Sequence, residues 1–390
     1  MAIEGRSDNK AGGRVRYGMV GGGEGAFIGA VHRLAARMDD NYEFVAGALS
    51  STPEKAQRSG EGLGLAADRI YPDFETMAKK EKRRKDGIEA VVIVTPNHMH
   101  APAAEAFIKA GIHVICDKPV TTTLKDALRL KKLAENAGVI FAVTHNYTGY
   151  PLVRHARSMV AEGVLGEIRL VQVEYPQDWL TNKIEDSGQK QAGWRTDPAR
   201  SGAGGCIGDI GTHAHNLAAF VSGLEPVQLL AELTTFVPGR RLDDNVQIML
   251  RYANGARGAM WASQVAPGNE NGLMLRIYGT KGGFHWRQDH PNELYYTPYG
   301  ELTRIVTRGS GAVGPAGARA TRIPAGHPEG YLEGFATIYT DIAHAIRAAR
   351  SGEKPPAEVM FPTIDDGIAG MAFIEAAVKS SAKGGVWVNM

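Results

Sequence analysis

Residues 14–29 read RVRYGMVGGGEGAFIG, a short segment that ends in a cluster of glycines and continues into a further apolar segment. Residues 14–20 are predicted to form a strand, and the segment that ends at Met38 is predicted to form a helix. Glycines between a strand and a helix permit a tight turn and let a pyrophosphate approach the backbone amides at the helix N-terminus. The position of the cluster therefore favours a dinucleotide-binding loop over an ordinary glycine-rich linker.

The segments that follow keep this alternation of strand and helix. Residues 90–95 (AVVIVT) are nearly all apolar, as expected for a parallel strand covered on both faces. Residues 101–110 are predicted to form a helix that ends at Gly111 in a left-handed cap. Other strands are predicted at residues 43–49, 112–116 and 139–144, with a helix that begins after Thr123, runs toward Asn136 and ends before Gly138. Repeated βαβ units predict an α/β Rossmann-type, doubly wound parallel sheet.

The pattern changes after a helix that begins near Pro151. Strands then follow one another, at residues 168–175, 246–252, 257–265, 273–278 and 293–297, with tight turns at Asn254-Gly255 and Lys281-Gly282-Gly283. Two further helices are predicted at residues 331–350 and 364–381. This is the signature of an α+β domain with a large, mostly antiparallel sheet, and its broad face predicts a homodimer or homotetramer.

The chain is long enough for two domains. We predict a flexible N-terminal tail at residues 1–13, a dinucleotide-binding Rossmann domain at residues 14–150, and a substrate-binding and oligomerisation domain at residues 151–390. The 390 residues are 43% hydrophobic and 22% charged, which is ordinary for a globular protein.

Charge and cysteine content exclude several classes of partner. Lys and Arg total 44 against 42 Asp and Glu, a net charge of +2, so no global field would attract nucleic acid or a membrane surface. The basic run at residues 79–85 is interpreted as a solvated helix face or loop. No apolar run approaches the ~20 residues that span a bilayer. The polar N-terminus and the two cysteines, Cys116 and Cys206, predict a cytoplasmic protein.

The first set of candidate cofactor residues lies in and after the glycine cluster. The loop supplies Gly21, Gly23, Glu24, Gly25 and Ala26, and either Gly25 or Gly29 closes the fingerprint. An acidic residue that binds the ribose is expected about 20 residues further on. That position holds Ser50, next to Ser51 and near Lys55. These residues fit the 2′-phosphate of NADP or the hydroxyls of NAD, and we favour NAD.

Three short stretches carry the remaining chemistry. Residues 95–100 (TPNHMH) and 117–119 (DKP) each follow a predicted strand, so they lie at the edge of the sheet where ligands of α/β proteins bind. Residues 208–216 (GDIGTHAHN) lie in the second domain. Asp209 and His213 are four residues apart and would share one face of a helical turn.

Together these features resemble the Gfo/Idh/MocA family, the glucose–fructose oxidoreductase and inositol dehydrogenase group. The resemblance covers nearly the whole chain after residue 13. It implies that Lys118 contacts the reacting hydroxyl, that His213 is the acid/base and that Asp209 is the third catalytic residue. Family members often have Glu before the lysine, where this chain has Asp117.

The resemblance also assigns further residues to the cofactor. Pro96 and Asn97, which follow Thr95, resemble positions that line the nicotinamide pocket. His100 either caps the next helix or supports the loop. Asn146 ends the last parallel strand and is expected to face the pocket. The remaining candidates are Asp117, Lys118, Trp194 and Arg195, and Arg195 could instead form a surface ion pair.

The predicted catalytic roles agree with elementary chemistry. Oxidation of a carbinol releases a hydride and a hydroxyl proton, and a histidine titrates near neutral pH, where it can take that proton. A lysine stabilises the alkoxide charge that develops, and Asp209 orients the site.

A second set of residues is predicted to bind the substrate. Besides the catalytic three it contains Tyr147, Tyr175, Gln177, Asp178, Arg195 and His327. His215 is interpreted as structural rather than as a second catalytic group. A metal site built on Asp209, His213 and His215 is disfavoured, because residues two apart on a helix point in different directions.

These observations predict an NAD(P)-dependent dehydrogenase that reversibly oxidises a secondary hydroxyl of a sugar, sugar derivative or cyclitol. Polar candidates outnumber the charged groups that could clamp a phosphate, which favours an uncharged polyol over a phosphorylated small-molecule substrate. Two alternatives are an NAD-dependent glycosidase that acts by transient oxidation and elimination, and a non-catalytic sugar or dinucleotide sensor.

Overall fold

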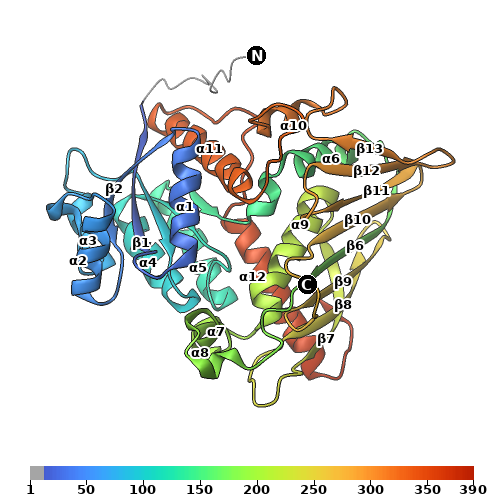
Figure 1. Ribbon diagram of the computed structural model, residues 1–390, viewed down its shortest axis with the longest axis horizontal. Helices are drawn as coiled ribbons and strands as arrows, with labels where there is room; N and C mark the ends of the chain where they lie inside the picture. The colour runs from blue at the N-terminus through green and yellow to red at the C-terminus, as the bar shows by residue number, and fades with distance from the viewer. Residues whose placement is uncertain (1–12) are drawn as a thin grey trace. The chain divides into compact units, whose positions relative to one another are not determined.

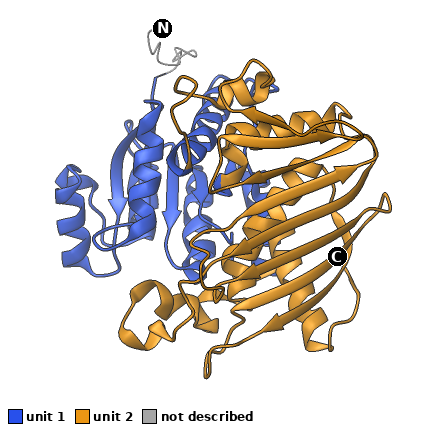
Figure 2. Ribbon diagram, turned by 45° about the vertical axis from the view of Figure 1, so that its right-hand side comes forward, with its two compact units in different colours: residues 1–121, 125–146, 331–368 blue, residues 122–124, 147–330, 369–390 orange. Residues whose placement is uncertain are grey.

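The computed structural model of the protein describes residues 13–390 (Figure 1). The predicted N-terminal tail, residues 1–13, lies outside the described residues except for Gly13. The described chain divides into two compact units (Figure 2). The first unit comprises the described residues up to 121, residues 125–146 and residues 331–368, and the second comprises residues 122–124, 147–330 and 369–390.

The first unit is built on a five-stranded parallel sheet in the order β2-β1-β3-β4-β5, which confirms the predicted doubly wound fold. Its strands are β1 (Val15–Gly21), β2 (Tyr42–Ala48), β3 (Ala90–Val94), β4 (His113–Cys116) and β5 (Phe141–Val143). Its helices are α1 (Phe27–Met38), α2 (Pro53–Gly62), α3 (Phe74–Glu81), α4 (His100–Ala110), α5 (Leu124–Ala137) and α11 (Tyr331–Arg350). Every residue of β3 is buried, as its apolar sequence predicted.

Helix α11 completes the core of this first unit. Its residues Phe335, Ile338 and Ile342 are buried in one cluster with apolar side chains of β1 and α1. The phenol of Tyr339 lies 2.7 Å from Nδ1 of His32, which is itself fully buried in α1. The sequence predicted the bounds of this helix but placed it in the second domain, because periodicity identifies a buried face without identifying what covers it.

The second unit is built on a nine-stranded sheet in the order β13-β12-β11-β10-β6-β9-β8-β7-β14. All pairings are antiparallel except β6 with β9. The strands are β6 (Ile168–Pro176), β7 (Pro226–Thr234), β8 (Asn245–Tyr252), β9 (Arg257–Ser263), β10 (Met274–Gly279), β11 (Gly282–Arg287), β12 (Glu293–Pro298), β13 (Arg304–Thr307) and β14 (Val388–Asn389).

Helices cover one face of this sheet and leave the other open. The helices of the second unit are α6 (Pro151–Ala161), α7 (Lys190–Arg195), α8 (Pro198–Ser201), α9 (Thr212–Ser222), α10 (Pro315–Ala320) and α12 (Ile364–Ala382), of which α12 begins in the first unit. Helix α9 packs against β6, β9 and β10. The view in Figure 2 looks onto the uncovered face of the sheet. By strand register Leu170, Met249 and Tyr278 share one face of the sheet, and all three are exposed.

One predicted turn is wrong. Gly282 and Gly283 belong to β11, and the turn that precedes them consists of Thr280 and Lys281. A Cβ on Gly283 would lie 2.5 Å from the ring of Tyr278 on β10, so this glycine permits a close approach of two strands and does not form the turn. Strands β7, β11, β13 and β14 were not predicted. Among the described helices, none is long and apolar enough to cross a membrane.

Candidate active site

The glycine loop of the first unit is anchored to the end of β2. The amide of Gly23 donates to the carbonyl of Leu49 at 3.2 Å, and the amide of Glu24 donates to Oγ of Ser59 at 3.0 Å. The amide of Ala26 turns back to the carbonyl of Gly23 at 3.0 Å, immediately before α1. Sequence reasoning missed Ser59, because it lies within α2 and carries no motif of its own.

The structure distinguishes Gly25 from Gly29, either of which could close the dinucleotide fingerprint. A Cβ on Gly29 would lie 2.4 Å from Cα of Gly22, so Gly29 lets α1 pack closely on the loop, the role of the third glycine in the dinucleotide fingerprint. Gly25 has a φ of +72°, and nothing lies within 4 Å of the place where its Cβ would stand. The loop at Gly25 therefore has open space beside it.

The predicted ribose residues follow β2. Oγ of Ser50 accepts from the amide of Thr52 at 3.1 Å, so it stabilises the start of α2. Ser51 is exposed, Lys55 is half-buried, and the side chain of Glu24 in the loop is exposed. No carboxylate stands at the end of β2, as the sequence indicated.

Polar side chains tie together the carboxyl ends of β4 and β5. Oδ1 of Asp117 accepts from the amide of Lys118 at 3.0 Å and from Oγ1 of Thr144 at 2.9 Å. The backbone that precedes Lys118 is therefore fixed, while the Lys118 side chain remains partly accessible. Asp117 makes these supporting contacts although its side chain is shorter than that of the Glu often found at this position in the family.

His100 connects the segments after β3 and β4. Its ring nitrogens lie 2.9 Å from the carbonyl of Thr95 and 2.8 Å from the carbonyl of Pro119. Burial lowers the pKa of His100, and a neutral ring donates to one of these carbonyls. His100 thus supports the loop, one of its two predicted roles. Asn97 is buried in the short helical turn that begins after Pro96.

Two of the predicted cofactor residues of the first unit have buried atoms that lack hydrogen-bond partners among the described residues. These atoms are Oγ1 of Thr95 and Nδ2 of Asn146, which follow β3 and β5. A buried polar atom without a partner is unfavourable, so both atoms fit a polar ligand at this edge of the sheet. Together with the open loop at Gly25, they suit a dinucleotide that carries hydroxyl, amide and pyrophosphate groups.

The second unit holds Asp209 in a π-helical turn (Ile207–Gly211) that leads directly into α9. Its Oδ2 accepts from Nε2 of Gln264 at 2.8 Å, and its Oδ1 lies 3.2 Å from Nε of Arg195 in an ion pair. The Arg195 guanidinium also lies over the ring of Trp194, 4.2 Å from its centroid. Arg195 therefore forms an ion pair with the predicted catalytic carboxylate, and its predicted contacts with cofactor and substrate stay predictions.

His213 follows in the first turn of α9 and is 8% exposed. The ring of Tyr147 meets it edge-on at 5.0 Å between centroids, and that of Tyr175 lies at 6.3 Å. The two phenol oxygens are 2.5 Å apart, and burial raises the pKa of Tyr147. The rings of Tyr147 and Tyr175 thus pack against the imidazole of His213, and both tyrosines carry neutral hydroxyl groups.

An amide network that the sequence did not reveal extends from these tyrosines. Oδ1 of Asn271 accepts from the phenol of Tyr175 and from Nε2 of Gln177, both at 2.8 Å. Nδ2 of Asn271 donates to Oε1 of Gln288 at 2.7 Å. Asn271 and Gln288 lie in loops that flank β10 and β11, and no local pattern marks either one.

The last predicted substrate residues lie apart from this network in the described contacts. Oδ2 of Asp178 accepts from the amide of Gly268 at 3.3 Å. His327 is exposed, and its carbonyl accepts from Nη2 of Arg308 at 2.6 Å. Their roles toward a substrate stay predictions.

His215 differs sharply from His213. Its ring stacks on Phe373 at 4.3 Å, and burial lowers its pKa to about 4. Nε2 of His215 has no hydrogen-bond partner among the described residues. Over the described part of the chain, no three His, Cys, Asp or Glu side chains are grouped so that they could hold a metal ion.

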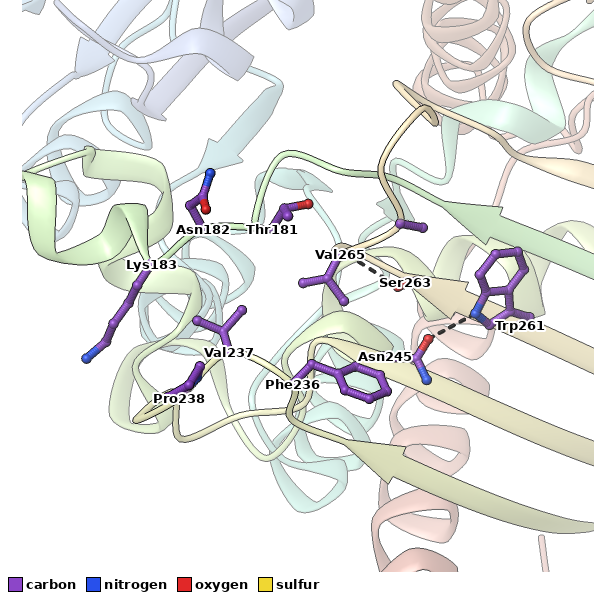
Figure 3. A pocket seen from close by; sticks show the side chains of 11 residues that line it. Thr181, Asn182, Lys183, Phe236, Val237, Pro238, Asn245, Trp261, Ser263 and Val265 are labelled. Atoms are coloured by element: carbon purple, nitrogen blue, oxygen red, sulfur yellow. Dashed lines mark hydrogen bonds between the residues drawn. The ribbon is translucent and has the colours of Figure 1, made fainter.

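A pocket of about 810 Å³ lies elsewhere in the second unit (Figure 3). Its lining residues are Thr181, Asn182, Lys183, Phe236, Val237, Pro238, Asn245, Trp261, Ser263, Val265 and Ala266. Nε1 of Trp261 donates to Oδ1 of Asn245 at 2.9 Å. None of the predicted site residues lines this pocket, so its size does not make it the candidate active site.

Two family models match this chain, one in its N-terminal part and one in the part that follows. Residues 15–145 match an oxidoreductase family with an NAD-binding Rossmann fold, and residues 153–285 match the GFO/IDH/MocA C-terminal domain. The chain belongs to the Gfo/Idh/MocA family. The predicted family, fold and enzyme class are thereby confirmed, and the glycine loop lies in an NAD-binding domain.

Relatives of this Gfo/Idh/MocA protein match it over nearly their whole length. An oxidoreductase from Sinorhizobium meliloti is 56% identical, with a TM-score of 0.88 over 96% of this chain and 99% of its own. An inositol dehydrogenase homologue from Azotobacter vinelandii, solved with NADH and myo-inositol, is 35% identical, with a TM-score of 0.91 over 97% and 98%. Levoglucosan dehydrogenase of Pseudarthrobacter phenanthrenivorans is 28% identical over 96% and 98%.

Proposed function

We propose that this Gfo/Idh/MocA oxidoreductase is an NAD-dependent dehydrogenase that oxidises a secondary hydroxyl of a cyclitol, sugar or sugar derivative to a ketone. The observation that carries the proposal is the arrangement of Asp209 and His213. A carboxylate held on both oxygens precedes, by one helical turn, a buried imidazole held between tyrosines. Relatives named as inositol and levoglucosan dehydrogenases support the same class of substrate.

In this proposal each catalytic residue handles a different charge. His213 takes the proton of the hydroxyl, because imidazole titrates near neutral pH. The ammonium of Lys118 stabilises the negative charge that develops on the oxygen. Asp209 orients the site. Bound NAD supplies the hydride acceptor, and the glycine loop, Thr95 and Asn146 would hold it.

The network around Asn271 favours an uncharged substrate. Its members are tyrosine hydroxyls and side-chain amides, which donate and accept hydrogen bonds without carrying charge. Arg195, the cation that adjoins Asp209, is already paired with that carboxylate. A polyol that exchanges hydroxyl contacts with these groups fits better than a phosphorylated sugar.

Two further parts of the proposal concern assembly and location. The open face of the second sheet, with Leu170, Met249 and Tyr278 exposed, supports association into a homodimer or homotetramer. Cys116 and Cys206 are both free and buried, which supports a cytoplasmic location. Sedimentation analysis of the purified protein tests the first part, and a monomer at micromolar concentration would contradict it.

Hydride transfer tests the central proposal. Purified protein with NAD, and separately with NADP, is incubated with a panel of inositols, monosaccharides, anhydrosugars and glycosides, and the reduced nicotinamide is followed by its absorbance. We expect reduction of NAD with at least one cyclitol or sugar. Binding of NAD without reduction on any member of the panel would contradict the proposal. Cleavage of a glycoside without net reduction would instead identify the glycosidase alternative.

A further inference from the structure

Two adjacent buried carboxylates precede β8 in the second unit, and they have different partners. Asp244, fully buried, accepts from the amides of Phe236 and Val237 and forms an ion pair with Arg240 at 3.1 Å. Asp243 is 7% exposed and forms no ion pair within the described chain. Its partners are backbone amides of a distant segment.

That segment is the turn that carries Asp209. Oδ1 of Asp243 accepts from the amide of Gly205 at 2.6 Å, and Oδ2 accepts from the amide of Ile207 at 2.8 Å. The carbonyl of Asp243 accepts from the amide of Cys206, between them, at 2.8 Å. One residue thus binds three successive amides at the start of a helix, where amides have no partner within the helix.

The fit between the two segments is tight and leads directly to the candidate catalytic residue. A Cβ on Gly205 would lie 2.2 Å from the carbonyl oxygen of Asp243, so only glycine permits this approach. The amide of Asp209 donates to the carbonyl of Gly205 at 2.9 Å, and His213 follows one turn later. A shift of the Gly205 backbone would therefore move both side chains.

Burial of the ionised Asp243 carboxylate lowers the free energy of unfolding. Burial raises the pKa of its carboxyl to about 6, and the charge of Asp244 adds to the increase. Since this pKa exceeds the ordinary value of 3.8, the free energy of unfolding falls as the pH rises from about 4 to about 6. A residue with only a packing role would be more stable as a neutral side chain.

We infer that Asp243 is a positioning residue, which fixes the backbone at residues 205–207 and thereby sets the places of Asp209 and His213. The inference rests on the proposed function for its effect on turnover. Both carboxylate oxygens are needed, because an asparagine would present its NH₂ group to one of the two amide donors. The contact with the turn is therefore specific to a carboxylate.

The test compares Asp243→Asn with the control Asp244→Asn, in the full chain under conditions where both remain folded. Amide hydrogen exchange of a peptide that spans residues 205–209 reports on the turn without any substrate. Asp243→Asn is expected to accelerate exchange there roughly five- to tenfold, because one amide loses its acceptor. Asp244→Asn is expected to lower the melting temperature at least as much, because the buried Arg240 then keeps only one of its two carboxylate partners, Glu185, and to leave exchange at 205–209 unchanged.

Turnover provides the second reading in the same preparations. We expect kcat of Asp243→Asn to fall on the order of 100-fold, with unchanged affinity for NAD, whereas Asp244→Asn keeps kcat within about threefold of the parent. Equal exchange and equal kcat in the two variants would overturn the inference. If the parent protein does not reduce NAD with any member of the substrate panel, the proposed function fails. Amide exchange alone then decides whether Asp243 holds the turn.

A second variant covers the case in which Asp243→Asn does not fold. Gly205→Ala separates the same two segments from the other side and retains the carboxylate. It is expected to accelerate exchange at residues 206–209 and to lower kcat in the same sense. Unchanged exchange and unchanged kcat in a folded Gly205→Ala protein would contradict the inference.

Discussion

The two units build their candidate sites from different parts of the chain. The first unit uses mainly backbone, in a glycine loop anchored to β2, and leaves Oγ1 of Thr95 and Nδ2 of Asn146 without hydrogen-bond partners in the described chain. The second unit uses side chains that contact one another, with Gln264 and Arg195 on Asp209 and two tyrosine rings against His213.

This difference suits two kinds of ligand. A dinucleotide carries a pyrophosphate that any correctly placed amides can bind, so backbone geometry is sufficient and side-chain identity matters little. A hydroxyl that must lose its proton requires particular side chains in particular protonation states. Substitutions should therefore separate the units: added Cβ atoms should harm the first site, and changes of chemical group should harm the second.

The largest expected effect comes from His213→Phe, which keeps an aromatic ring and removes the proton acceptor. We expect kcat to fall by about 10²- to 10⁴-fold, with unchanged affinity for NAD, measured by steady-state kinetics and fluorescence titration. His215→Phe, two residues away, is the matched control and should keep kcat near that of the parent. A similar loss in both variants would show that the helix, and not the imidazole, matters.

We expect His215→Phe to differ from the parent protein in its stability at low pH. Burial lowers the pKa of His215 to about 4 from 6.5, so the stability that depends on its neutral form is complete above pH 6.5 and is lost as the pH falls toward 4. For a pKa shift of this size the loss in the free energy of unfolding is up to about 3 kcal/mol, and His215→Phe removes it. Urea unfolding at pH 7 and pH 4.5 checks it. An equal fall in the free energy of unfolding for variant and parent would contradict the buried neutral state.

A smaller effect is expected from the neutral network. Asn271→Leu removes one hydrogen-bond partner from each of Tyr175, Gln177 and Gln288, so kcat/KM for a polyol should fall roughly 10- to 100-fold, while the affinity for NAD is unchanged. Steady-state kinetics with the substrate identified in the panel measures this loss. An unchanged kcat/KM would separate this network from the substrate.

The smallest expected effect concerns the backbone site. Gly25→Ala places a Cβ beside the loop at a φ of +72°, where the strain is about 1–2 kcal/mol, so affinity for NAD should fall about tenfold. Gly64→Ala, also at positive φ (+74°) and also in open space, should lose similar stability and keep its affinity. Isothermal titration with NAD measures both. Equal affinities would place the cofactor away from Gly25.

The sequence predicted the first unit better than the second for the same physical reason. A glycine loop and all-apolar strands such as β3 are local patterns, so both could be found along the chain. Asp209 and His213 lie four residues apart in one short motif, and the family resemblance assigned their roles. Gln264, Asn271 and Asp243 contact residues far away in the sequence, and no local pattern records such contacts. Gly282 and Gly283 misled the prediction, because a glycine that permits close strands looks the same in sequence as one that forms a turn.

Helix α11 has a consequence for how this protein is made. The sheet of the first unit is complete by residue 143, but the helix that buries β1 and α1 begins at Tyr331. During synthesis the ribosome must therefore add nearly the entire second unit before the first can close its core. A nascent chain that stops at residue 150 would expose the apolar surface that Phe335 and Ile338 cover, and would depend on chaperones to remain in solution.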